Sequence, residues 1–215
     1  MENTCPICKL GEEFVKFSQV VNSSNIAIEC ERCGKFTITH PEFLVAKGRA
    51  PMLKLSAWIR NRNLRGIEIP LIRSDTCDDI IKSIPNYSPR EKQLILLQNI
   101  ERMTKYPGNT VSLKPELDMP LAWAENEKEF LYFLDSLFER GLIMTDEKTR
   151  TLNDMSNVVS ITADGWDYLK KHELMIEERT QAFVAMSFSD EMRPYWENAL
   201  KPAIEKAGYK AYRVD

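Results

Sequence analysis

The residues with the clearest chemistry in this chain are four cysteines arranged in two pairs. The stretch "CPIC" contains Cys5 and Cys8, and "CERC" contains Cys30 and Cys33. A CxxC turn directs two thiolates toward one point, so two such turns form a tetrahedral cage of four thiolates, which suits zinc. The 21 residues between the pairs slightly exceed the usual spacing of about 15–20. Because four thiolates leave no open coordination position, we expect a structural zinc site without a catalytic role.

The elements that must position these thiolates are short strands. "EEFVKFSQVV" and "NIAIEC" have the pattern of two strands joined by the turn "NSSN", and "GKFTITH" supplies a third strand. Gly34 gives the chain room to curl under the metal. Residues 1–40 are therefore predicted to form a zinc ribbon whose folding depends largely on the metal. The alternatives are two disulfides, which a reducing cytosol disfavours, and reduced thiols without metal.

Two other residues could join such a site, but we expect them to have structural roles. Cys77 stands alone and has the character of a small buried residue, and His40 is expected beside the start of the helix "HPEFLVAKG". The net charge of −3 excludes polyanion binding by bulk electrostatics. No apolar run approaches the roughly 18 residues that span a bilayer. The N-terminus lacks the features of a signal peptide, so a cytoplasmic protein without a membrane partner is predicted.

A basic segment lies between Phe43 and Ile67, where the sequence has no Asp or Glu. Its basic residues are Lys47, Arg49, Lys54, Arg60, Arg62 and Arg65. One interpretation is a nucleic-acid-binding surface that contacts phosphates, with Arg60, Arg62 and Arg65 as its candidate residues. The other is a solvated helix, "MLKLSAWIRNRNLRG", whose charges pair with acids elsewhere, such as Asp75, Asp78 and Asp79.

The middle of the chain, residues 41–178, is predicted to be helical. "YSPREKQLILLQNIERM" begins with the capping box of Ser88 and Glu91. Further on, "ENEKEFLYFLDSLFERG" has an amphipathic pattern, two strands are expected at Leu142–Thr145 and Val158–Ile161, and Thr162 caps a last helix. This order of helix, wing and helix resembles the back half of a winged-helix domain. The helix that would enter a DNA groove is acidic, which favours a scaffolding or sensing role over DNA binding.

The end of the chain reads as one βαβ unit. Ala182–Met186 is a continuous apolar run of strand length, which suits a strand covered on both faces of a parallel sheet. The helix "SDEMRPYWENALKPAIEKAG" and the strand "YKAYRVD" follow it. Two strands and one helix cannot cover both faces of a sheet. We therefore expect the chain to be a fragment of a longer protein, with open strand edges that favour a homo-oligomer.

"FVAMSF" and "KPAIEKAGYKAYRVD" are similar to the opening of the nucleoside 2-deoxyribosyltransferase-like, TIR-like family over about the last 35 residues. The resemblance implies a flavodoxin-like, doubly wound sheet and an activity that cleaves or exchanges N-glycosidic bonds of nucleosides, nucleotides or NAD, in some members for antiphage defence. Ligands of such folds lie outside the carboxyl ends of the strands. The substrate-binding candidates are therefore Ser187, Phe188 and Asp215. The family's catalytic carboxylate would lie on a later helix, so no catalytic residue is assigned.

The sequence thus predicts an α+β protein with three parts: a zinc ribbon at 1–40, a helical, winged-helix-like domain at 41–178, and an incomplete α/β domain at 179–215. We expect a sensor or scaffold region of a nucleotide-processing effector. The longer protein would bind a nucleoside or nucleotide ligand, and this fragment would be inactive. The alternative is a nucleic-acid-binding regulator that uses the ribbon and the basic segment.

Overall fold

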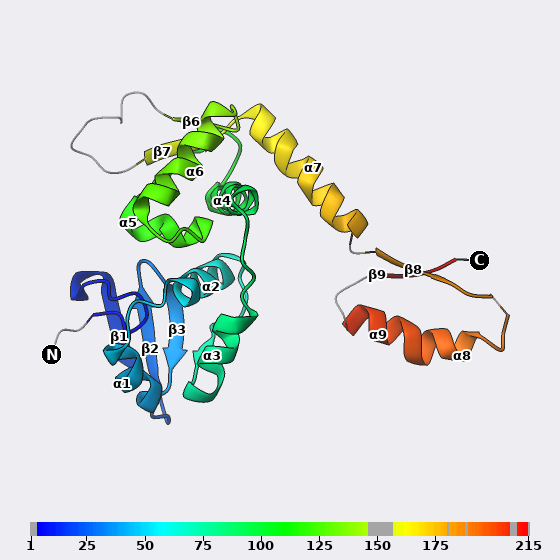
Figure 1. Ribbon diagram of the computed structural model, residues 1–215, viewed down its shortest axis with the longest axis horizontal. Helices are drawn as coiled ribbons and strands as arrows, with labels where there is room; N and C mark the ends of the chain where they lie inside the picture. The colour runs from blue at the N-terminus through cyan, green and yellow to red at the C-terminus, as the bar shows by residue number, and fades with distance from the viewer. Residues whose placement is uncertain (1–3, 146–156, 180, 188, 207–209, 215) are drawn as a thin grey trace. The chain divides into compact units, whose positions relative to one another are not determined.

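The computed structural model describes residues 4–145, 157–179, 181–187, 189–206 and 210–214, and it is mixed α+β as predicted (Figure 1). The chain divides into two compact units, Met1–Trp166 and Asp167–Asp215. The division falls inside helix α7 (Ala163–Arg179). The predicted boundaries at residues 40 and 178 stay a prediction. No helix in the described ranges is both long and apolar enough to cross a membrane.

The first unit begins with a four-stranded sheet. Its strands follow one another in the order β1 (Val15–Gln19), β2 (Ile26–Cys30), β3 (Gly34–Ile38) and β4 (Leu71–Ile72), after the short 3-10 helix η1 (Glu12–Phe14). The first three strands are antiparallel and confirm the predicted meander. β4 is an addition that the sequence analysis did not predict: it pairs with β3 in parallel, and the N–H of Thr37 donates to the carbonyl of Pro70 at 2.9 Å.

Three helices complete the core of this sheet. They are α1 (His40–Gly48), α2 (Leu53–Leu64) and α3 (Ser74–Ser83), and all three match helices expected in this part of the chain. Phe36 and Ile38 of β3 share one buried cluster with Leu55 and Ile59 of α2. The cluster also contains the four paired cysteines. The first sheet therefore buries its apolar face against helices that follow it in the chain.

Gly34 is required by its backbone conformation and by its surroundings. Its φ is +85°, in the left-handed region where residues with a Cβ are disfavoured. A Cβ at this position would lie 2.7 Å from Oδ1 of Asn63, which also accepts the N–H of Lys35. The expected turn below the second cysteine pair is confirmed, and Asn63 of α2 holds it in place.

The second half of the first unit contains helices around a small sheet. Its elements are α4 (Pro89–Met103), β5 (Val111–Leu113), α5 (Pro115–Asp118), the 3-10 helix η2 (Met119–Ala122), α6 (Glu127–Glu139), β6 (Ile143–Thr145) and β7 (Asn157–Ile161). The three strands are antiparallel in the order β5-β7-β6. The polar stretch between β6 and β7, residues 146–156, lies outside the described residues.

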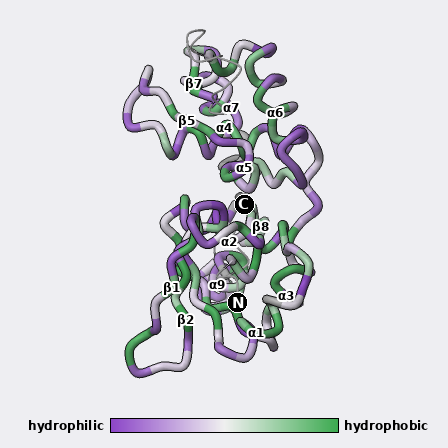
Figure 2. The backbone as a smooth tube through the Cα atoms, turned by 90° about the vertical axis from the view of Figure 1, so that its left-hand side faces the viewer, coloured by the Kyte–Doolittle hydropathy of each residue, from purple (hydrophilic) through white to green (hydrophobic). Residues whose placement is uncertain are grey.

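Local signals in this half are confirmed. Oγ of Ser88 accepts the N–H of Glu91, and the Glu91 carboxylate accepts the N–H of Ser88, which completes the capping box of α4. Hydrophobic and hydrophilic stretches alternate along α6 (Figure 2). The predicted amphipathic pattern is confirmed, since one side of the helix is buried through Phe130, Phe133, Leu134 and Leu137. Thr162 caps α7 through its Oγ1, which accepts the N–H of Gly165 at 3.0 Å.

A buried polar network joins α2, α4 and η2. Nδ2 of Asn99 donates to Oδ1 of Asn61 at 2.7 Å and to the carbonyl of Leu121 at 2.6 Å. Nδ2 of Asn61 donates to the carbonyl of Pro120 at 2.9 Å. Both asparagines are almost fully buried, so these hydrogen bonds fix the position of η2 and of the turn that follows it.

The second unit contains a parallel pair of strands, β8 (Gln181–Ala185) and β9 (Lys210–Val214). The predicted helix between them consists of three segments: α8 (Arg193–Tyr195), the π-helical turn η4 (Trp196–Leu200) and α9 (Lys201–Lys206). The predicted βαβ order is therefore present. The coverage of both strand faces that the apolar run suggested is not found among the described residues, since Phe183 is 62% exposed and stacks on Tyr212, which is 42% exposed.

Candidate functional site

The four paired cysteines come together in the first unit. Their sulfur atoms all lie within 4.8 Å of one another. Sγ of Cys5 is 3.8 Å from Sγ of Cys33, and Sγ of Cys8 is 3.6 Å from Sγ of Cys30. No bonded disulfide joins them, because all four are free. Each is at most 3% exposed, so the cage is buried.

Tight turns hold the two pairs in place. In the first, the N–H of Lys9 donates to the carbonyl of Cys5 at 3.0 Å, and Lys9 adopts a left-handed φ of +63°. In the second, the N–H of Cys33 points to Sγ of Cys30 at 3.5 Å. Ser56 of α2 adds an outer contact, 3.1 Å from Sγ of Cys33. Here the Cys33 thiol donates to Oγ of Ser56; toward a metal-bound thiolate, which carries no proton, the hydroxyl would donate instead and orient the sulfur.

The cage fits a tetrahedral metal ion. A sulfur–metal distance of about 2.3 Å in tetrahedral geometry gives sulfur–sulfur edges of about 3.8 Å, close to the edges found here. Burial raises the pKa of the Cys33 thiol, while hydrogen bonds, the largest from Cys33, lower the pKa of the Cys30 thiol. Four buried thiols ionise together only when a cation offsets their charge. The residues are thus compatible with a metal bound by four thiolates and leave no position for a substrate.

Cys77 and His40 lie outside this cluster, as expected. The four-cysteine group is the one potential metal-binding cluster within the described part of the chain. Cys77 is buried on α3, and burial raises the pKa of its thiol. His40 is the first residue of α1. Neither residue contributes to the four-cysteine cluster.

One buried charge was not predicted from the sequence. Glu42 of α1 is fully buried, and its carboxylate oxygens form no hydrogen bond with the described residues. Its nearest cation is Arg49, with Nη1 at 3.5 Å from Oε1, and the same Nη1 is 3.7 Å from the carboxylate of Asp78. Arg49 of the basic segment is therefore used to balance internal acids, which matches the structural interpretation of that segment.

Arg60 also has an internal partner. Its Nη2 is 3.1 Å from the carboxylate of Asp118, and its Nη1 donates to the carbonyl of Glu31. Burial raises the pKa of Asp118, although the hydrogen bond from the Lys114 N–H and the charge of Arg60 both act to lower it. Arg60 thus links α2 to the turn after β2 and to α5. It does not lie with the other two arginine candidates, Arg62 and Arg65.

Arg62 and Arg65 lie together on a different side of α2. The guanidinium of Arg62 is 4.7 Å from the ring of Trp58, and Arg65 is exposed. Both arginines line a cavity of about 220 Å³ whose walls include Trp58, Tyr87 and Trp123. The aromatic residues were missed by the sequence analysis. The spacing of Trp58 and Arg62 by one helical turn was a signal for part of the group, but nothing local pointed to Trp123.

The substrate-binding candidates of the second unit are only partly described. Phe188 and Asp215 lie outside the described residues. Ser187 is exposed, its Oγ accepts the N–H of Ser189 at 3.2 Å, and its carbonyl accepts from the guanidinium of Arg213. This contact belongs to a local turn and caps no helix, since α8 begins at Arg193 with Met192 as its N-cap residue, and the ligand role of Ser187 stays a prediction.

We also compared the chain with known proteins. No protein-family model, curated protein or solved structure matches it.

Proposed function

We propose that residues 1–166 are a zinc-organised sensor or scaffold module. It would be joined to the start of a nucleoside 2-deoxyribosyltransferase-like, TIR-like domain of a longer protein. That protein would bind a nucleoside, nucleotide or NAD and cleave its N-glycosidic bond. The observation that carries the scaffold half is the closed four-thiolate cage, which is built into the same buried cluster as α2.

Zinc is the metal that this donor set favours. A tetrahedral set of four thiolates is typical of structural zinc. The cage has no carboxylate or imidazole ligand and no exposed edge. A site of this kind contributes its binding free energy directly to folding. We therefore assign zinc the role of holding the first sheet against α2.

A winged-helix-like organisation of the following region is supported by its topology. Helix α4, strand β5, two short helices, helix α6 and the hairpin β6–β7 follow in that order, and β7 lies between β5 and β6. The outer surface of α6 carries three exposed acids, Glu127, Asp135 and Glu139. Acids on the helix that would face DNA repel phosphates, which supports a scaffolding role.

The enzymatic half is supported by the parallel pairing of β8 with β9 across intervening helical segments. Such a unit is the building block of doubly wound sheets, in which ligands bind at the carboxyl ends of the strands. It agrees with the resemblance of "FVAMSF" to the family's first strand. The alternative, a nucleic-acid-binding regulator, is weakened because Arg60 is already paired with Asp118.

Two measurements test the two halves separately. Elemental analysis of the purified chain should find one zinc ion per chain, and a chain that folds without any bound metal would overturn the scaffold assignment. The complete protein encoded by the gene should release the base from NAD or from a deoxynucleoside, as measured by chromatography. Failure with every substrate of both classes would remove the enzymatic half and leave the zinc assignment unaffected.

A further inference from the structure

We propose that the first unit contains a binding pocket for a nucleoside diphosphate or a similar mononucleotide, in which aromatic side chains stack on the base and Arg62 and Arg65 bind the phosphates. The pocket lies between α2, the connection from α3 to α4, and the turn at Trp123. The proposal rests neither on the zinc assignment nor on the chemistry of the second unit.

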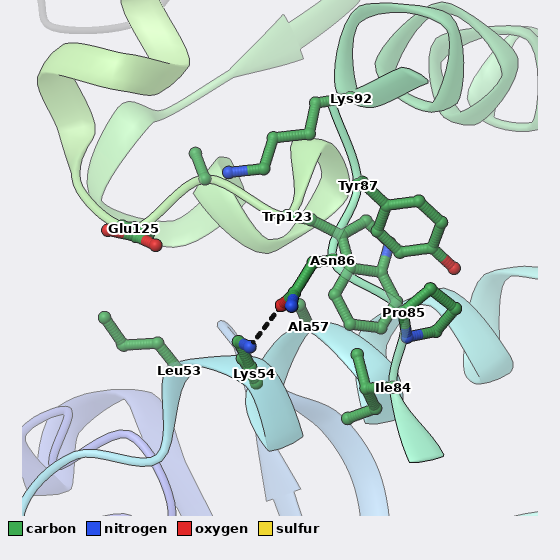
Figure 3. Close-up of a pocket in the computed structure, with 11 residues that line it drawn as sticks. Leu53, Lys54, Ala57, Ile84, Pro85, Asn86, Tyr87, Lys92, Trp123 and Glu125 are labelled. Carbon is green, nitrogen blue, oxygen red and sulfur yellow. Dashed lines mark hydrogen bonds between the residues drawn. The ribbon is translucent and has the colours of Figure 1, made fainter. Parts of the chain in front are cut away.

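The pocket consists of two adjoining cavities, of about 220 Å³ and about 190 Å³. Both have the same four residues in their walls: Ile84, Pro85, Tyr87 and Trp123. Figure 3 shows the smaller cavity, with the rings of Tyr87 and Trp123 beside Pro85 and the ammonium group of Lys54 donating to Asn86. Each cavity alone is smaller than the range of about 300–1,000 Å³ that small-molecule sites occupy, so a mononucleotide would have to occupy both.

The aromatic wall is held in an uncommon conformation. The rings of Tyr87 and Trp123 have centroids 5.1 Å apart and are tilted by 56°. Trp123 has a φ of +53°, in the left-handed region that bulky residues avoid. Its Nε1 is buried and donates to no described acceptor. Strained residues of this kind occur preferentially at ligand sites, where surrounding contacts over-determine their conformation. Here the Asn61–Asn99 network beneath the turn provides those contacts.

Positive charge in the larger cavity is not neutralised. None of the residues that line it carries a carboxylate, and no described carboxylate forms an ion pair with Arg62 or Arg65. Nη2 of Arg62 donates to the backbone carbonyl of Glu68 at 3.3 Å, while its Nε is buried without a described acceptor. The pKa of Arg102 is lowered mainly by burial and then by the nearby positive charge of Arg65. Guanidinium groups with free donors bind phosphates well.

The distribution of charge favours a mononucleotide over a nucleic-acid strand. In the smaller cavity, Glu125 is part of the wall, and Lys92 is already paired with Glu129 at 2.8 Å. The smaller cavity thus has the carboxylate of Glu125 as well as the ammonium group of Lys54, which donates to the neutral Asn86, whereas the larger cavity has two guanidinium groups and no carboxylate. A strand requires a groove that stays positive along several nucleotides, whereas one base with its phosphates requires one aromatic wall and one basic end.

The proposal can be tested by titrating the full chain with ADP, GDP, CDP and UDP and following tryptophan fluorescence and heat release. At least one of them should bind saturably. Arg65→Glu, at an exposed position, should weaken that binding by about tenfold or more. Arg73→Ala is the matched control, because Arg73 is exposed, pairs with Asp75 and lies outside the pocket. This variant should bind as the unaltered chain does.

Three further ligands identify which part of the proposal fails. The matching nucleoside should bind more weakly than the diphosphate, and inorganic phosphate should compete poorly. The proposal is overturned if no nucleotide binds, if Arg65→Glu binds as well as Arg73→Ala, or if phosphate alone competes as well as the nucleotide. A single-stranded oligonucleotide whose affinity rises with its length would overturn it in favour of nucleic-acid binding.

Discussion

Two of the three sheets described in this protein, β1–β4 and β8–β9, are built from similar apolar strands and reach different degrees of burial. In the β1–β4 sheet, Phe36 and Ile38 are at most 1% exposed. In the β8–β9 sheet, Phe183 is 62% exposed although its strand is at least as apolar in sequence. Apolar content therefore does not decide burial; what decides it is the number of layers that the rest of the chain places on a sheet.

The first sheet receives two kinds of support that the second lacks. Helices α1 to α3 supply residues to its buried cluster, and the cysteine cage ties β2 and β3 to the segment before β1. Within the described residues the second sheet has one helical layer, α8 to α9, and no cross-link. A sheet of two strands with one covered face is marginal by itself, which is why an apolar strand can remain exposed here.

The largest effect should come from removing the metal cage. Cys8→Ser should abolish metal binding and the fold of the first sheet, because a structural zinc contributes on the order of 10 kcal/mol to the fold that binds it. Far-ultraviolet circular dichroism and zinc content measured on the same sample check both effects. The second unit holds none of the four ligands, so amide signals from β8 and β9 should be unchanged.

Cys77→Ala is the matched control for this experiment. Cys77 is also buried, but it lies outside the cage. Its replacement should keep the zinc and lower the free energy of unfolding by only about 1 kcal/mol. If Cys8→Ser retained a folded first sheet, or if Cys77→Ala lost the metal, the difference between the two sheets would not depend on the cage.

The next effect concerns close packing at the start of α7. A Cβ at Gly165 would lie 2.1 Å from the carbonyl oxygen of Leu142, a backbone atom that cannot move aside. Gly165→Ala should therefore lower the free energy of unfolding by about 3 kcal/mol, the upper range for overpacking. Gly48→Ala is the control, since nothing lies within 4 Å of its added methyl group. Equal denaturation midpoints for the two variants would contradict this packing.

Several features of the fold could be predicted from short stretches of the sequence. The strands β1 to β3, the capping box of Ser88 and Glu91, and the inward face of α6 follow from patterns of a few adjacent residues. The cysteine cage was predictable because its four ligands lie in two short motifs. Contacts between distant segments could not be predicted from the sequence. The two-residue strand β4 exists only through its pairing with β3. No nearby residue indicated the left-handed conformation of Trp123 or the burial of Glu42.

The same distinction limits what could be predicted for the candidate sites. The basic segment was visible as a run of charges, but only the folded chain separates Arg49 and Arg60, which balance internal acids, from Arg62 and Arg65, which do not. The aromatic partners come from three separate segments. Their proximity is a property of the tertiary fold, which local spacing does not encode.

A smaller effect is expected at the buried carboxylate of the first unit. Arg49→Ala removes the nearest cation from Glu42 and should lower the free energy of unfolding by about 1–2 kcal/mol, less than for a fully buried pair because Arg49 is partly exposed. The double variant Arg49→Ala, Glu42→Gln should recover most of the loss in urea unfolding. Arg73→Ala breaks the exposed pair with Asp75 and should cost at most about 0.5 kcal/mol.

The smallest effect should occur on the open face of the second sheet. Phe183→Ser removes a ring that is mostly exposed and contacts mainly Tyr212, so the free energy of unfolding should change by about 0.5 kcal/mol or less. Phe36→Ser, on the covered sheet, should cost about 3–5 kcal/mol. Hydrogen exchange resolves the two sheets in one experiment. A large loss of amide protection around β8 in the Phe183 variant would mean that this face is covered, and the contrast between the two sheets would no longer hold.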